Sequence, residues 1–266
     1  MTYEKSHPPL LDFRNITVYR GDTLALNGLS LSIPCGQHVA IIGPNGSGKS
    51  TLIRTMMRYD HPVRRYRPVM KLFGRSDWHV QDMRRLVAIV SNEMVHSCCK
   101  SAASGRSVVL SGYYSSFELW PQHTVSPEMD SRGAEVLRLM GARHLRDKPI
   151  NAMSTGEAKR VVIGRALVNE PKALLLDEPS NGLDIRAALG LRETLRRIAA
   201  LGTSLIYVTH HLPDIVPEVS RVILLSEGRI YADGPKEELL TDETLSKLYG
   251  TRVEVECKDG YFNCWA

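Results

Sequence analysis

Two kinds of hydrophobic pattern follow one another along the chain. Between Leu10 and Ile33, apolar and polar residues alternate on either side of the turn-forming segment Arg20-Gly21-Asp22. A period of two is typical of antiparallel strands that bury one face, so this region is predicted to form an antiparallel β-subdomain. Five later runs are continuously apolar, as in strands buried on both faces of a parallel sheet. These runs are Val39 to Ile42, Leu86 to Val90, Ala173 to Leu176, Leu205 to Val208 and Val222 to Leu225.

Helical patterns separate several of these runs. They cover Lys49 to Arg58, Glu157 to Val168 and Arg186 to Ala200. Strands that alternate with helices indicate an α/β core built on a parallel sheet.

Residues 92–156 interrupt this alternation. They contain a Ser/Cys loop, a helical piece from Ser107 to Tyr114 and an amphipathic helix around Ala134 to Met140. We therefore expect a mainly helical subdomain inserted into the core. Near the end of the chain, residues alternate around Asp259-Gly260, and this dipeptide favours the tight turn of a β-hairpin.

Composition narrows the class of protein only slightly. The 266 residues are 43% hydrophobic and 24% charged, which is typical of a globular protein, and the net charge of +5 is too small to indicate nucleic-acid binding by itself. Five cysteines without a Cys-x-x-Cys pair favour a reduced, cytosolic compartment. We find neither the apolar stretch of a signal peptide nor the roughly 20 apolar residues of a membrane span.

The segment IIGPNGSGKST follows the first continuously apolar run and precedes a helical pattern. It matches GxxxxGK(S/T) in the context that this motif requires. Backbone N–H groups of such a loop wrap phosphate oxygens, Lys49 reaches the β- and γ-phosphates, and the Ser50 hydroxyl can bind Mg²⁺. The predicted nucleotide-binding residues here are Gly43, Pro44, Asn45, Gly46, Ser47, Gly48, Lys49, Ser50 and Thr51.

Polar residues also end two other predicted strands. ALLLDEPS ends in Asp177 and Glu178, and YVTHH ends in Thr209, His210 and His211. Beside a phosphate loop, Asp177 is expected to support Mg²⁺ and Glu178 to orient and deprotonate the attacking water. Of the two histidines, His210 is the predicted hydrogen-bond donor to a γ-phosphate oxygen at the same edge of the sheet.

The segment NAMSTGEAKR, residues 151–160, has two interpretations. Ser154 and Glu157 have the spacing of a capping box, with which any helix can begin. Gly156 lies in the first turn, where the lack of a Cβ would also let an anion approach bare N–H groups.

These motifs in this order resemble the nucleotide-binding subunit of an ATP-binding cassette (ABC) transporter, over roughly Leu10 to Leu248. Met153 to Glu157 is similar to the LSGGQ signature of the family, and Pro179 to Asp184 resembles its D-loop. Tyr19 resembles the aromatic residue that stacks on adenine. KLFGR and VVLSGYY are similar to a subgroup of importers for molybdate or iron chelates.

The resemblance implies a P-loop NTPase fold of the α/β class, with a RecA-like core, an N-terminal antiparallel β-subdomain and an inserted helical subdomain. It places the ATP-binding core at 1–91 and 157–250 and the helical subdomain with the signature at 92–156. The alternation around Asp259-Gly260 adds a hairpin tail at 251–266. The resemblance also implies ATP and Mg²⁺ as cofactors. Two copies would pair head to tail, so that Ser154 and Gly156 bind the γ-phosphate held by the Lys49 of the other copy.

One residue departs from the family pattern. Asn92 stands where the family usually has a glutamine that contacts Mg²⁺ and couples to the transporter. Its side chain is one methylene shorter, so we expect it to act through a bridging water. Asn92 and Asp184 complete the predicted nucleotide-binding residues, and Ser50, Asp177 and Asn92 are the predicted metal-binding set.

The resulting interpretation is an ATP-hydrolysing subunit of an importer, peripheral on the cytoplasmic face of the membrane. Its expected partners are a second ATPase subunit, membrane permease subunits and a solute-binding protein, without nucleic acid. A soluble ABC ATPase acting on ribosomes or nucleic acid is the alternative, although such relatives commonly fuse two cassettes or carry coiled-coil inserts. A P-loop small-molecule kinase would leave the signature segment unexplained.

Overall fold

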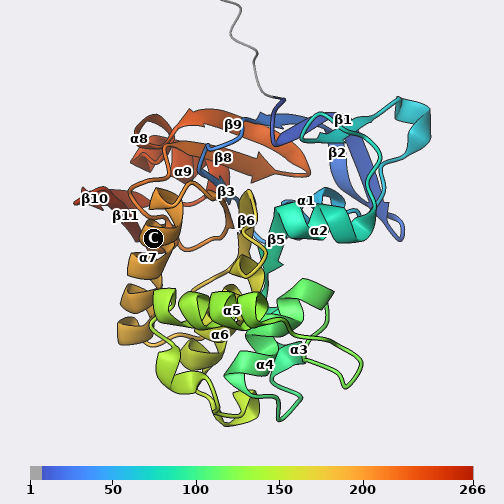
Figure 1. Cartoon of the computed structure of the whole chain (residues 1–266). Helices are drawn as coiled ribbons and strands as arrows, with labels where there is room; N and C mark the ends of the chain where they lie inside the picture. Colours follow the sequence, from blue (N-terminus) through green and yellow to red (C-terminus); the bar gives the residue numbers. More distant parts are fainter. Residues whose placement is uncertain (1–7, 266) are drawn as a thin grey trace, which may run out of the picture. The chain divides into compact units, whose positions relative to one another are not determined.

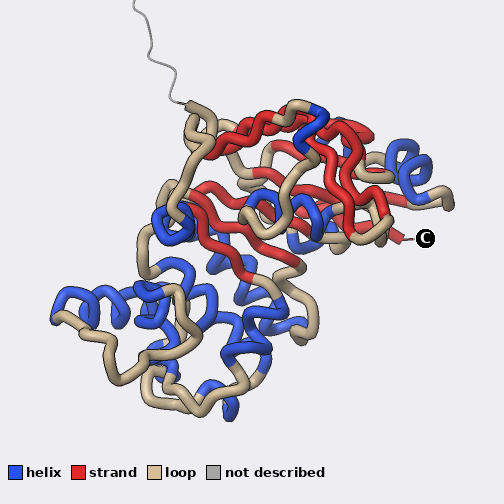
Figure 2. Tube along the Cα trace, turned by 90° about the vertical axis from the view of Figure 1, so that its right-hand side faces the viewer, coloured by secondary structure: helices blue, strands red, loops and turns tan. Residues whose placement is uncertain are grey.

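The computed structural model describes residues 8–265, which form two compact units. The first unit contains the residues up to 79 together with those from 204 onward, and the second contains residues 80–203. Strands dominate the first unit, whereas helices dominate the second (Figure 2). Each unit is described by itself.

An antiparallel sheet in the order β2-β1-β4 opens the first unit. Its strands are β1 (Leu11–Arg20), β2 (Thr23–Ile33) and β4 (Val69–Leu72). Leu29, Leu31 and Ile33 are buried between exposed serines, so the predicted alternation and its antiparallel pairing are confirmed. The sequence patterns did not predict β4, which pairs with β1 and buries Met70.

Continuously apolar strands form the parallel part of the same unit, in the order β7-β3-β8 with β9 antiparallel at the edge. The apolar strands are β3 (Val39–Ile42), β7 (Ser204–Val208) and β8 (Arg221–Ser226). The edge strand β9 (Arg229–Pro235) has only exposed or half-buried residues. All residues of β3 and β7 are buried, as the apolar runs predicted. Helix α1 (Lys49–Met56) follows β3 after the glycine-rich loop.

Two short helices and a hairpin complete the first unit. Helix α8 (Lys236–Leu239) packs on β8 and β9 (Figure 1), and α9 (Asp242–Tyr249) packs against β10. Strands β10 (Glu254–Lys258) and β11 (Tyr261–Trp265) pair antiparallel. Asp259 and Gly260 take left-handed φ angles of 53° and 78° at the turn, so the predicted C-terminal hairpin is confirmed.

The second unit contains a parallel pair of strands and most of the helices. Strands β5 (Val87–Val90) and β6 (Ala173–Asp177) pair in parallel. The helices are α2 (Val80–Leu86), α3 (Asn92–Cys98), α4 (Gly105–Leu110), α5 (Pro127–Leu139), α6 (Thr155–Leu167) and α7 (Ile185–Ala200). None of the helices in residues 8–265 is both long and apolar enough to cross a bilayer.

The segment expected to be a Ser/Cys loop is instead helix α3. Ser91 caps it by accepting a hydrogen bond from the backbone N–H of Met94 at 3.2 Å, and Val95 and Cys98 are buried. Burial raises the pKa of Cys98 to about 11, so this thiol remains protonated at neutral pH.

The limits of the compact units differ from the predicted limits of the helical subdomain at 92 and 156. Strands β5 and β6 pair with each other and α6 packs on β5, so both strands belong with the helices. The division of the chain into an ATP-binding core and a helical subdomain remains a prediction.

Candidate nucleotide site

The glycine-rich loop between β3 and α1 has no room for side chains at two of its glycines. A Cβ on Gly43 would lie 2.2 Å from the carbonyl oxygen of Leu225, and one on Gly48 would lie 2.6 Å from that of Ala25. Gly48 and Gly46 also have positive φ angles, of 103° and 81°. The chain can therefore turn this tightly only with glycine, which leaves the backbone N–H groups uncovered.

Lys49 lies directly behind this loop. Its buried ammonium group donates hydrogen bonds to the carbonyl oxygens of Gly43 at 2.6 Å and Pro44 at 2.9 Å. The hydroxyl of Ser47 is buried and has no hydrogen-bond partner among the described residues. An uncovered backbone, a cation and an unused hydroxyl suit a polyphosphate. Ser50 is exposed in the first turn of α1, and Thr51 beside it is buried.

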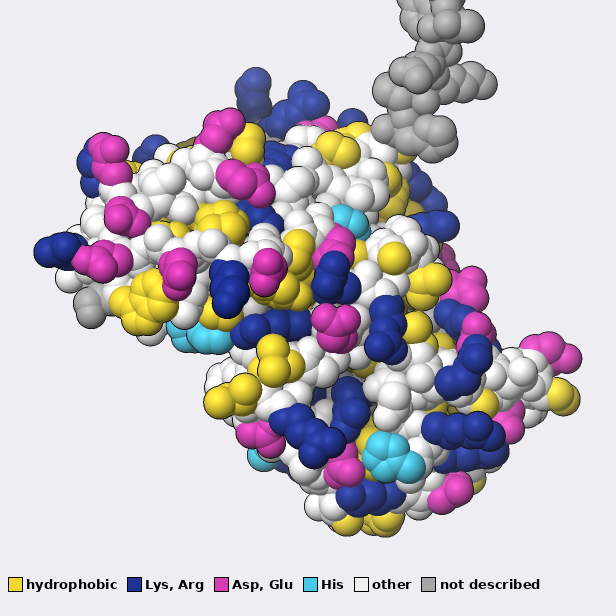
Figure 3. All heavy atoms as spheres, turned by 90° about the vertical axis from the view of Figure 1, so that its left-hand side faces the viewer, with side chains coloured by type: hydrophobic (Ala, Val, Ile, Leu, Met, Phe, Trp, Pro, Cys, Tyr) yellow, Lys and Arg dark blue, Asp and Glu magenta, His cyan; other side chains and the backbone are white. Residues whose placement is uncertain are grey.

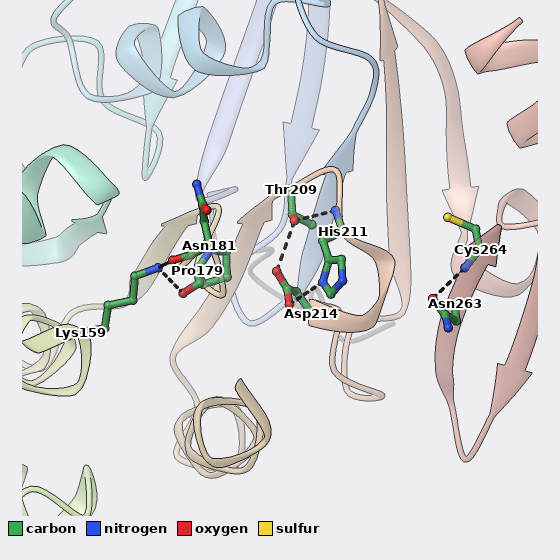
Figure 4. Close-up of polar contacts among 8 residues, drawn as sticks. All are labelled: Lys159, Pro179, Asn181, Thr209, His211, Asp214, Asn263 and Cys264. Carbon is green, nitrogen blue, oxygen red and sulfur yellow. Dashed lines mark hydrogen bonds and ion pairs between the residues drawn. The ribbon is translucent and has the colours of Figure 1, made fainter. Parts of the chain in front are cut away.

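His210 emerges beside this loop. The N–H of Thr209, at the end of β7, donates to the carbonyl of Ile41 in β3 at 3.2 Å, two residues before Gly43. His211 turns into a local network with Thr209 and Asp214 (Figure 4). Its ring nitrogen Nδ1 lies 3.0 Å from a carboxylate oxygen of Asp214, and its backbone N–H donates to the Thr209 hydroxyl at 3.0 Å. The side chain of His211 thus stabilises the turn, and His210 is exposed at the same strand end.

Tyr19 is exposed near the end of β1, where it pairs with Leu24 of β2. Leu24 precedes Ala25, whose carbonyl closes over Gly48. Within the first unit, the structure therefore places Tyr19, the glycine-rich loop and His210 on neighbouring elements.

The second unit brings Asn92 to the same edge as Asp177 and Glu178. Val90 at the end of β5 lies opposite Leu176 in β6, and Asn92 is the first residue of α3. Glu178 has a φ of 49°, which is uncommon for a residue with a side chain. Strained backbone of this kind is often found at functional sites.

Helix α6 holds the loop that follows Glu178. The ammonium group of Lys159 is buried and donates to the carbonyl oxygens of Pro179 at 2.8 Å and Asn181 at 2.6 Å (Figure 4). The sequence motifs did not reveal this residue. A lysine next to the buried stretch of α6 was the signal that could have identified it, because a charged side chain is buried only with partners.

The capping box predicted at the start of α6 is confirmed. The Ser154 hydroxyl accepts from the N–H of Glu157 at 3.2 Å, and the Glu157 carboxylate accepts from the N–H of Ser154 at 2.8 Å. Lys148 donates to the same carboxylate at 2.8 Å. Its hydrogen bond is the main reason that the pKa of Glu157 is lowered, and the hydrogen bond from the Ser154 backbone adds to it.

Gly156 has a second neighbour, the start of α7. A Cβ on Gly156 would lie 2.9 Å from the Cβ of Ala187, and Thr155 lies beside Gly182. Asp184 caps α7 by accepting from the N–H of Ala187 at 2.7 Å. The signature segment and the loop from Pro179 to Asp184 therefore lie side by side in the second unit.

Comparison with known proteins supports these motifs. The family model described as "ABC transporter" matches residues 26–181, more than half of the chain. The hemin import ATP-binding protein HmuV of Rhodococcus jostii is 30% identical over 90% of this chain and 80% of its own. The cobalt import ATP-binding protein CbiO of Rhodobacter capsulatus is 30% identical over 92% of this chain and 85% of its own.

A solved structure is similar over the same extent. It is cbiO1 of Clostridium perfringens, part of the ABC transporter complex cbiONQ, with a TM-score of 0.75 and 28% identity over 90% of this chain and 94% of that chain. The chain therefore has the α/β fold of a P-loop NTPase with an antiparallel β-subdomain. The chain belongs to the ABC transporter family, as one of its ATPase cassettes.

Proposed function

We propose that this chain powers import through a separate membrane permease, and that two copies pair when they bind ATP. The observation that carries the proposal is the similarity, over about nine tenths of the chain, to proteins named for the import of hemin and cobalt. In this role the chain lies on the cytoplasmic face of the membrane, beside the permease and a solute-binding protein. The transported solute is a property of those partners.

The proposed hydrolysis divides the work among the residues described above. Lys49 and the N–H groups of residues 43–51 bind the phosphates, while Tyr19 stacks on the base. Glu178 accepts the proton of the attacking water, and His210 donates a hydrogen bond to a γ-phosphate oxygen. A hydroxyl, a carboxylate and an amide, from Ser50, Asp177 and Asn92, are oxygen donors of the kind that suit Mg²⁺. When bound, Mg²⁺ neutralises charge that develops on the phosphates.

The pairing of two copies is supported by the exposure of the signature segment. Ser154 and Thr155 are exposed at the start of a helix of 13 residues, with Gly156 behind them. A helix start with uncovered N–H groups attracts anions. We propose that this helix start, with Gly156 and Asp184 beside it, closes over the ATP of the second copy.

Aromatic side chains on the second unit support a permease contact. Phe117 and Trp120 are exposed, and Tyr114 stacks on His123 with ring centroids 4.0 Å apart. A cavity of about 640 Å³ lies beside them, lined in part by Tyr113, Tyr114, His123 and Met129. Exposed aromatic clusters are typical of protein interfaces.

The soluble alternative has less support. Positive and negative side chains are interspersed on the face that Figure 3 shows, whereas nucleic-acid binding usually needs a continuous basic surface. Co-purification with a permease would favour import, and salt-sensitive binding to ribosomes or DNA would favour the alternative.

The test of the proposed function is the variant Glu178→Gln in the full chain with Mg²⁺ and ATP. Loss of the general base should lower turnover by roughly 10² or more while ATP binding is retained. The variant should also form an ATP-dependent dimer in size-exclusion chromatography with light scattering. Adding Ser154→Arg should abolish this dimer. Glu193→Gln, an exposed carboxylate in α7, is the matched control. Wild-type turnover in Glu178→Gln would contradict the mechanism.

A further inference from the structure

The C-terminal hairpin packs on the segment that follows His210. Strand β11 lies against the short helix η5 (Leu212–Asp214), and Phe262 of this strand is only 5% exposed. At the hairpin turn, a Cβ on Gly260 would lie 3.0 Å from Pro217. The hairpin and residues 212–217 are therefore in close contact within the first unit.

Lys236 joins the two segments from within the core. Its side chain is 1% exposed, and its ammonium group donates to the carbonyl oxygens of Pro217 at 3.3 Å and Gly260 at 3.2 Å. The nitrogen also lies 5.5 Å from the centre of the Phe262 ring, within the range of a cation–π contact. A buried ammonium group is costly unless such partners compensate for the lost water, so this contact holds both chain segments in place.

The other end of the segment contacts the residues on either side of His210. Asp214 is 2% exposed, and its two carboxylate oxygens lie 3.0 Å from Nδ1 of His211 and 3.4 Å from the hydroxyl of Thr209. Ile215, Val216 and Val219 are buried between Asp214 and Ser220. The N–H of Lys236 donates to the carbonyl of Ser220 at 2.9 Å. The segment is thus fixed at Asp214 beside His210 and at Pro217 and Ser220 by Lys236.

We propose that the C-terminal hairpin and Lys236 form a support that positions His210 for hydrolysis. Lys236 is a positioning residue, because it acts through the segment 211–219 and not on the nucleotide. The proposal rests on the proposed function, in which His210 hydrogen-bonds the γ-phosphate. It gives the hairpin, which none of the nucleotide motifs includes, a part in the reaction.

The test is a double-mutant cycle in the full chain, with wild type, Lys236→Met, His210→Ala and the double variant. Methionine keeps the length and apolar stem of the lysine but cannot donate. Displacement of a catalytic group by about 1 Å costs up to about 10²-fold, so Lys236→Met should lower kcat about tenfold with the KM for ATP changed less than twofold. In the His210→Ala background, single-turnover measurements should show no further decrease. Lys247→Met, which removes an exposed lysine paired with Glu243 in α9, should leave kcat unchanged.

Two results would overturn the inference. One is an unchanged kcat in Lys236→Met. The other is an equal decrease with and without His210, which would show a general loss of folding. If Lys236→Met does not fold, Phe262→Leu loosens the same contact and should give the same pattern. If wild type and Glu178→Gln hydrolyse ATP equally, the proposed function fails instead, independently of Lys236.

Discussion

Gly156 has both a packing role and a proposed binding role, and one pair of substitutions separates them. In Gly156→Ala the new methyl group would lie 2.9 Å from the Cβ of Ala187. An alanine side chain cannot rotate away, so the start of α6 must shift from the start of α7. Overpacking of this kind costs about 1–3 kcal/mol, and the better helix propensity of alanine returns at most about 1 kcal/mol. We expect a net loss of up to about 2 kcal/mol in the free energy of unfolding.

A matched control and a compensating variant test this magnitude. A methyl group on Gly190, in the middle of α7, would meet no atom within 4 Å outside the backbone of its own helix, so Gly190→Ala should stabilise the chain by about 0.5–1 kcal/mol. The double variant Gly156→Ala with Ala187→Gly removes the close contact, and its stability should return to within about 1 kcal/mol of wild type. Urea unfolding of the four proteins measures these differences.

ATP turnover of the compensated variant then reports on binding. If phosphate must approach the bare backbone at Gly156, the double variant should unfold like wild type and still hydrolyse ATP slowly. Full turnover would remove that role and leave only packing. A Gly156→Ala variant as stable as Gly190→Ala would refute the packing argument itself.

Three further predictions address other contacts. Gly43→Ala should abolish ATP binding because its methyl group would lie 2.2 Å from a backbone oxygen. Gly46→Ala meets only an unfavourable φ and should weaken ATP binding less. Equal ATP affinities of the two variants in calorimetry would contradict this. Lys159→Met leaves the carbonyls of the 179–181 loop without their donor, and it should destabilise the chain by about 1–3 kcal/mol and slow hydrolysis more than ATP binding. Glu157→Gln keeps the capping box without the charge. The pKa of Glu157 in the folded chain lies below its ordinary value of 4.5, so its ion pair with Lys148 contributes at most about 1 kcal/mol to stability above pH 4.5. This contribution is lost as the pH falls through the lowered pKa. The thermal unfolding temperatures of wild type and Glu157→Gln should therefore converge between pH 7 and pH 3.

Sequence patterns predicted the elements whose burial is uniform. The runs that became β3 and β7 are buried throughout, so their apolar residues are continuous and visible. Strand β9 was not predicted, because its residues are only exposed or half-buried at the edge of the sheet and carry no apolar signal. Helix α3 was missed because seven residues are too few for a helical period to stand out among Ser and Cys.

The residues of the candidate site also fall into those that the sequence predicted and those that it did not. The glycine-rich loop and the capping box depend on residues close in sequence, and the pattern was sufficient to find both. The contacts of Lys159 with Pro179 and of Lys236 with Pro217 join residues about 20 positions apart, and nothing in the spacing indicates them. Such contacts follow from tertiary packing and not from the spacing of residues along the chain.

The hydrogen bonds of Lys159 have a mechanical consequence for a pair of cassettes. If two copies share their nucleotides as proposed, Glu178 serves the ATP of its own copy and Ser154 serves that of the other. Lys159 links the helix that Ser154 caps to the loop that follows Glu178. A displacement at one ATP would then be transmitted to the second through the first turns of α6, so that hydrolysis at the two sites would be coupled.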